Sequence, residues 1–142
     1  MKEFDSVVLK TIFRYVTPFI LVYGVYVLFH GDNIPGGAFQ AGGLFGIAIV
    51  MDRVIHGQKT TLFIQGKFAI ILAGIGTFLF IFVGFVSMLN GGNFLEYNAL
   101  PFDVSMKVKH TIGIVGIEIG IAICVASTIM VIFDALSRGR EQ

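Results

Sequence analysis

The sequence is poor in charge, in cysteine and in clustered metal ligands. Only 13% of its 142 residues are charged and the formal net charge is +1, so nucleic-acid binding has no electrostatic support. The single cysteine, Cys124, excludes an internal disulfide and is expected to be a small buried apolar side chain. The three histidines lie far apart without i, i+4 spacing, so no metal site is expected within the chain.

The sequence is instead rich in apolar residues. Hydrophobic residues make up 56% of the chain and the mean hydropathy is +0.87. A soluble domain of this size would expose much of that surplus to water, whereas a membrane protein exposes it to lipid. The 18 glycines fit the same environment, because glycine is more frequent in membrane helices than in soluble ones. We therefore predict an all-α integral membrane protein without a cofactor.

Long runs without charge predict where the chain crosses the bilayer. Residues 68–89 are 22 positions without a charged side chain, which at about 1.5 Å per residue cross a hydrocarbon layer of about 30 Å. Residues 112–133 form an equally long run interrupted only by Glu118, and 11–29 form a third in which Arg14 can reach the headgroups. With 35–51 as a fourth span, residues 1–142 are predicted to form one transmembrane domain of four helices.

The segment 35–51 is shorter and contains Gln40 and five glycines, so it is either a full span or a re-entrant segment. Basic residues favour the full span. With four crossings, Lys107 and Lys109 are the only basic residues on one side, and the other eight share the side of both termini. The positive-inside rule then places the termini in the cytoplasm of a multi-pass inner-membrane protein. The eight are Lys2, Lys10, Arg14, Arg53, Lys59, Lys67, Arg138 and Arg140.

Glu118 lies six residues into the predicted span 112–133. A carboxyl group at that depth is unfavourable in lipid, so it must face protein, water or a bound ion. An acid balanced between burial and a nearby cation can exchange a proton for that cation. Glu118 is therefore a candidate for an ion or proton pathway, and the alternative is a protonated acid that acts as a structural hydrogen-bond partner.

The same predicted helix has two distinct faces. Gly113, Gly116 and Gly120 form a smooth stripe suited to close helix packing. At about 100° per residue, Glu118 lies about 140 to 160° away from all three. Three other short helices cover both faces only with difficulty, so we expect the Glu118 face to meet another subunit. Ordinary packing within the chain is the alternative for the glycines.

An aromatic row is predicted along the first span. Tyr15, Phe19, Tyr23, Tyr26 and His30 fall within an arc of about 80° of a helix. Tyr23 and Tyr26 place two hydroxyl groups in mid-span, and His30 places an imidazole at the outer end. The row is either part of a proton pathway led by His30 or a set of aromatic packing and anchoring contacts.

The most distinctive stretch is 30–43, which reads as an outer turn followed by a glycine-rich helix start. Pro35 suits the first helical position, and the two glycines after it leave the free N–H groups of the helix end unshielded. Such an end can receive a carboxylate or a water molecule, or it is simply a turn with tight packing. The residues of interest are Asp32, Pro35, Gly36, Gly37, Phe39, Gln40, Gly42 and Gly43, with Gly46 one turn further on.

This stretch resembles the H-x-x-x-P-G-G-G-F-x-G-G signature of the MnhB/MrpB family. Here Ala38 replaces the third glycine, and four residues instead of three separate His30 from Pro35. Members of that family are small membrane subunits of multisubunit Na⁺/H⁺ antiporters, and related subunits occur in membrane-bound hydrogenases. The resemblance covers essentially the whole chain. It implies a subunit beside larger antiporter-like chains that carry the main proton channels.

Three functions remain open on the sequence. The first is a non-catalytic subunit of a Na⁺/H⁺ antiporter, bound to other membrane subunits and to lipid, with Na⁺ and H⁺ as cargo. The second is a membrane-arm subunit of a redox-driven complex such as a hydrogenase. The third is an architectural membrane protein that moves no ion. Four short helices without an internal repeat are a poor complete transporter, so the first two functions place the chain in an assembly, whereas an architectural protein could bind either lipid or a partner.

Overall fold

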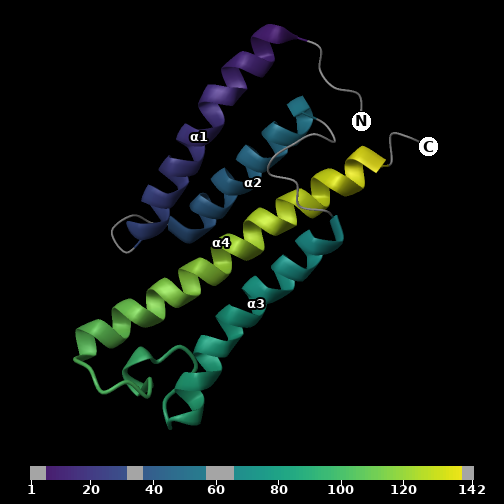
Figure 1. The fold of residues 1–142 in the computed structure, drawn as a ribbon. Coiled ribbons are helices and arrows are strands. Elements are labelled where there is room, and N and C mark those ends of the chain that lie inside the picture. The colour runs from purple at the N-terminus through teal and green to yellow at the C-terminus, as the bar shows by residue number, and fades with distance from the viewer. Residues whose placement is uncertain (1–5, 32–36, 57–65, 139–142) are drawn as a thin grey trace.

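The computed structural model describes residues 6–31, 37–56 and 66–138, and it contains four long helices and one short one (Figure 1). The long helices are α1 (Val7–Phe29), α2 (Gly37–His56), α3 (Gly66–Leu89) and α4 (Met106–Arg138), and a 3₁₀ turn, η2 (Tyr97–Ala99), lies between α3 and α4. All four long helices are apolar and long enough to cross a membrane, and the described residues contain no strand. The predicted all-α fold with four spans is confirmed.

The helices lie side by side in the order α1, α2, α4, α3 (Figure 1). α4 packs along α2 on one side and along α3 on the other, while α1 packs mainly on α2. Within the described ranges, neither α1 nor α2 contacts α3. The chain therefore forms a single layer with α4 at its centre and is not a closed bundle.

Glycine allows the closest approaches between the helices. A Cβ built on Gly76 of α3 would lie 2.5 Å from the backbone oxygen of Gly120 on α4. A Cβ built on Gly42 of α2 would lie 2.8 Å from the backbone oxygen of Ala122 on the other side of α4. Small residues at such crossings let helix backbones meet in lipid, where packing replaces the hydrophobic effect as the driving force.

The helices are longer than the apolar runs that predicted them. α4 begins at Met106 and extends to Arg138, because Lys107 and Lys109 continue the helical hydrogen bonding outside the apolar run. At about 1.5 Å per residue its 33 residues measure about 50 Å. α1 begins at Val7, where the Ser6 hydroxyl caps the helix by accepting a hydrogen bond from the Leu9 N–H at 3.4 Å.

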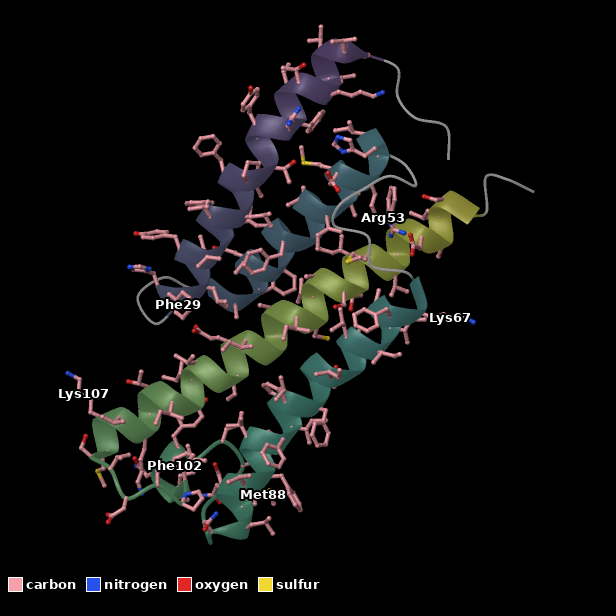
Figure 2. The ribbon with its side chains drawn as sticks, viewed as in Figure 1. Phe29, Arg53, Lys67, Met88, Phe102 and Lys107 are labelled. Atoms are coloured by element: carbon pink, nitrogen blue, oxygen red, sulfur yellow. The ribbon has the colours of Figure 1, made fainter. Side chains whose placement is uncertain are left out.

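The side chains show the same division between apolar surface and polar ends. Large apolar side chains such as Phe29 and Met88 are exposed on the outside of the layer (Figure 2). Lys67 and Lys107 lie at opposite ends of the layer, at the first turns of α3 and α4. Such an outer surface suits lipid or the helices of another membrane protein.

Candidate functional site

The Glu118 carboxyl group lies where the end of α1 meets the start of α2. A Cβ built on Gly31 would collide with Glu118 Oε1 and would lie 3.0 Å from its Cδ. The same position lies 3.3 Å from the Cα of Gly37, so the two glycine backbones touch each other beside the acid. Glycine at position 31 therefore makes room for the carboxyl group, which is half-buried.

We expected the Glu118 face to meet another subunit, and the structure instead places the chain's own α1–α2 junction against it. Gly116 faces Val83 of α3 and Gly120 faces Gly76, while Glu118 points to the opposite side of α4. The expectation assumed that three helices could not cover both faces of the fourth. Because α4 is the central helix of a single layer, α3 covers one face and the α1–α2 pair covers the other.

The glycine-rich stretch contributes to the same contact with α4. Gly37 and Ala38 are buried at the first turn of α2. A Cβ on Gly42 would lie 2.8 Å from Val125, and one on Gly46 would lie 2.9 Å from Ile129, so both glycines face α4. The face of α2 that carries these glycines therefore packs closely on α4, and this packing places the α1–α2 junction in contact with Glu118.

The other side of the stretch faces outward. Phe39 and Gln40 are exposed, and a Cβ on Gly43 would meet no atom within 4 Å. Asp32, Pro35 and Gly36 lie outside the described residues.

The aromatic row lies on the outer surface of α1. The His30 ring stacks on Tyr26 with ring centres 4.1 Å apart, and Tyr26 stacks on Tyr23 at 6.2 Å. His30 Nδ1 lies 2.9 Å from the Tyr26 carbonyl oxygen, which assigns the proton to Nδ1 when the ring is neutral. All three rings are exposed, as are those of Tyr15 and Phe19.

The loop between α3 and α4 contacts the start of α4. A Cβ on Gly113 would collide with the ring of Tyr97, and His110 Nε2 lies 2.8 Å from Asn98 Oδ1. Burial raises the pKa of the Tyr97 hydroxyl above its ordinary value, and the negative charge of Glu118 raises this pKa further. Glu118 therefore acts electrostatically on Tyr97 in the loop, in addition to contacting the α1–α2 junction.

A second polar group, which the sequence analysis did not single out, joins the other ends of α2 and α4. Arg53 Nη1 lies 2.5 Å from Asp134 Oδ1, and one turn of α2 away His56 Nδ1 lies 2.9 Å from Asp52 Oδ1. The side chains of Arg53 and Asp134 are only 11% and 14% exposed. In the sequence these residues flank separate apolar runs, and Arg53 served only to orient the chain.

Neither polar group has the composition of a metal centre. Across residues 6–31, 37–56 and 66–138, no three His, Cys, Asp or Glu side chains are placed to hold a metal ion together. Cys124 is partly buried, and its sulfur lies 3.3 Å from the hydroxyl oxygen of Thr77 on α3. It therefore belongs to the contact between α3 and α4.

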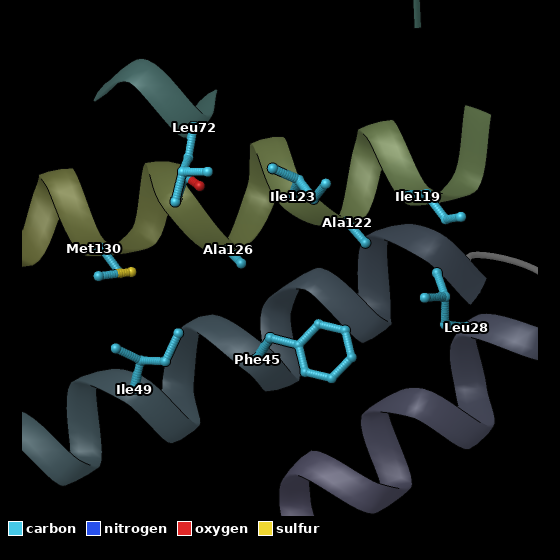
Figure 3. A pocket seen from close by; sticks show the side chains of 10 residues that line it. Leu28, Phe45, Ile49, Leu72, Ile119, Ala122, Ile123, Ala126 and Met130 are labelled. Atoms are coloured by element: carbon cyan, nitrogen blue, oxygen red, sulfur yellow. The ribbon is translucent and has the colours of Figure 1, made fainter. Parts of the chain in front are cut away.

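A groove of about 220 Å³ runs along α4 between α2 and α3 (Figure 3). Phe45 and Ile49 of α2 line it opposite Ile123 and Met130 of α4. Its walls are almost entirely apolar, so it suits an acyl chain or an apolar side chain and not an ion.

The chain was compared with known protein families, with individual proteins and with solved structures. A family model described as a domain related to the MnhB subunit of Na⁺/H⁺ antiporter matches residues 8–131. The chain is 31% identical over 145 residues to a Staphylococcus haemolyticus (strain JCSC1435) protein named "Putative antiporter subunit mnhB2", covering 99% of this chain and all of that protein. Proteins of the same name from Staphylococcus aureus strains Newman and JH1 are 32% identical over 143 residues, with the same coverage. No solved structure matches the chain.

Proposed function

Since this chain belongs to the MnhB family, we propose that it is a membrane subunit of a multisubunit Na⁺/H⁺ antiporter in which Glu118 takes part in moving the ion or the proton. The chain itself would catalyse no chemical reaction, and other membrane subunits would complete the pathway. The position of the Glu118 carboxyl group against Gly31, within a helix long enough to span the bilayer, carries the proposal.

The basic residues support a cytoplasmic location of both ends of the chain. Lys10 and Arg14 of α1, Arg53 of α2 and Lys67 of α3 lie at one end of the layer, whereas Lys107 and Lys109 lie at the other. By the positive-inside rule the first end faces the cytoplasm. Reporter domains fused to each terminus test this orientation, and a reporter active outside the membrane would contradict it.

The surroundings of Glu118 suit an acid that changes its protonation state. The free N–H groups near the start of a helix stabilise a negative charge, and Gly37 lies at that end of α2 beside the acid. The apolar layer around the site favours the neutral, protonated form. With these opposing influences, the arrival of a cation beside Glu118 releases its proton, and the departure of the cation lets the proton return.

Replacement of the acid tests this role. Glu118→Gln keeps the shape and removes the proton exchange, so Na⁺-driven proton movement in inverted membrane vesicles should fall about tenfold or more. Glu118→Asp keeps an acid and should retain part of the activity. Co-purification of the other subunits with each variant controls for assembly. Wild-type antiport by an assembled Glu118→Gln complex would leave only the architectural role.

A further inference from the structure

The groove along α4 lies on a hollowed side of the helix layer (Figure 3). Ala122, Ala126 and Met130 line it from α4 and are only 3%, 8% and 1% exposed. Ile132, about 160° from Met130 around the same helix, is 54% exposed. Because α2 and α3 flank α4 without contacting each other in the described ranges, they leave a groove on this side with α4 as its floor.

The groove has the width of a single hydrocarbon chain. Its lining on α4 extends from Ile119 to Met130, which is about 16 Å of helix. A chain about 4 Å across occupies about 200 Å³ over that length, close to the 220 Å³ of the groove. A helix with its side chains is about 10–12 Å across and would need more than about 1000 Å³. The groove is therefore too narrow for a helix of a partner subunit to enter.

The length and position of the groove match one leaflet of a bilayer. About 16 Å is close to half of a hydrocarbon layer of about 30 Å. Ile49 of α2 and Met130 of α4 line one end of the groove. One helical turn further along, Arg53 and Asp134 form the ion pair between the two helices. Since charged groups belong at the edge of the hydrocarbon layer, this end lies near the headgroups and the end at Ile119 lies near the middle of the membrane.

The walls of the groove offer apolar contacts from three sides. Nine of its ten lining residues are apolar, and the tenth, Ser127, is only 3% exposed, so an ion would find no set of ligands there. Phe45 of α2 and Leu72 of α3 lie on opposite sides of α4 (Figure 3). An occupant of the groove therefore contacts α2 and α3 at once, which the described parts of these helices do not do directly.

We propose that the groove holds one acyl chain of a phospholipid from the leaflet on the side of Arg53 and Asp134. This bound lipid supplies the contact that is missing between α2 and α3. Because lipid tails are as apolar as the groove, the lipid is held by close packing on three helices and not by the hydrophobic effect. It exchanges more slowly than the surrounding lipid, which touches only one face. The inference is independent of the proposed role of Glu118.

A photoreactive lipid tests the site in the purified complex. The complex is reconstituted in vesicles of phosphatidylethanolamine and phosphatidylglycerol, part of the latter with a diazirine in one acyl chain. It is then washed with detergent until bulk lipid is removed, irradiated and analysed by mass spectrometry. We expect label to remain on α4 between Ile119 and Met130. Loss of this label together with bulk lipid would overturn the site, as would its absence before the wash because a partner subunit covers the groove.

Substitutions that fill the groove give the matched comparison. Ala126→Leu places a larger side chain on the floor and should lower the label retained on α4 about tenfold, because the lipid loses the contacts of two or more methylene groups. Ala135→Leu is the control and should retain the wild-type label, since Ala135 is exposed and lies about 180° from Ala126 around α4.

Ile123→Phe, at a partly exposed position of the same wall, is the second filling variant and should have the same effect if Ala126→Leu does not assemble. Co-purification of the other subunits identifies the variants that assemble. Full retention of label by an assembled complex with either filling variant would contradict the bound lipid.

Discussion

At the scale of single residues, a buried ion pair between Arg53 and Asp134 joins α2 to α4. Removal of one partner leaves the other charge buried, which costs about 3–5 kcal/mol. Asp134→Ala should therefore lower the free energy of unfolding of the complex by up to that amount. Lys67→Ala, which removes an exposed charge at the same end of the layer, should change it by less than about 0.5 kcal/mol.

Unfolding of the purified complex in detergent, followed by heating or by added SDS, measures both variants. Asp134→Asn keeps the size of the side chain and should fall between the two. Equal stability of Asp134→Ala and Lys67→Ala would show that the pair contributes nothing measurable.

The Tyr97 hydroxyl gives a second prediction at this scale. Its pKa is raised first by burial and second by the charge of Glu118. Glu118→Gln removes the second cause, so the pKa of Tyr97 should fall and yet stay above its ordinary value. NMR of a ¹³C-labelled tyrosine ring, with Tyr97→Phe to assign the signal, follows the titration. An unchanged pKa would mean that Glu118 is neutral in the resting protein or lies too far from the ring.

At the scale of the helices, the glycine crossing between α3 and α4 leaves no room for a side chain. A Cβ on Gly76 would lie 2.5 Å and 2.6 Å from backbone atoms of Gly120 and Cys124, so Gly76→Ala forces the two helices apart. We expect a loss of about 1–3 kcal/mol in stability. Gly74→Ala is the matched control, because a Cβ at that position of the same helix meets no atom within 4 Å.

Thermal unfolding of the two alanine variants distinguishes the crossing from a general effect of glycine replacement. Alanine is the better helix former, so Gly74→Ala should be neutral or slightly stabilising. Destabilisation of both variants to the same degree would contradict a specific close contact at Gly76.

The helices could be predicted from the sequence better than their arrangement. Charge-free runs such as 68–89 predict spans because burial of backbone groups in lipid requires helices. The same runs are apolar on nearly all sides, so they do not reveal which helix is central. For this reason the face of α4 that carries Glu118 was expected to contact another subunit, whereas it contacts the α1–α2 junction. The pairing of Arg53 with Asp134 was equally hidden, because it depends on the register between α2 and α4.

At the scale of the whole molecule, a single layer of helices leaves much apolar surface and the aromatic row of α1 without cover from the chain itself. The hydroxyl groups of Tyr23 and Tyr26 lie on that exposed face, and lipid offers them no hydrogen-bond partner. We expect the chain to be much more stable when it is made together with the other subunits. Pulse-chase measurement of its half-life with and without them tests this, and equal half-lives would indicate that the layer is stable alone.

The central helix also sets a mechanical constraint. Glu118 and Asp134 are 16 residues apart on one uninterrupted rod, or about 24 Å. Since helices resist stretching, a slide or rotation of α4 that follows an event at either acid must displace the other by a similar amount. A change in charge at Glu118, inside the membrane, would thus be transmitted to the Arg53–Asp134 ion pair at the other end of α4 without a relay through intermediate side chains.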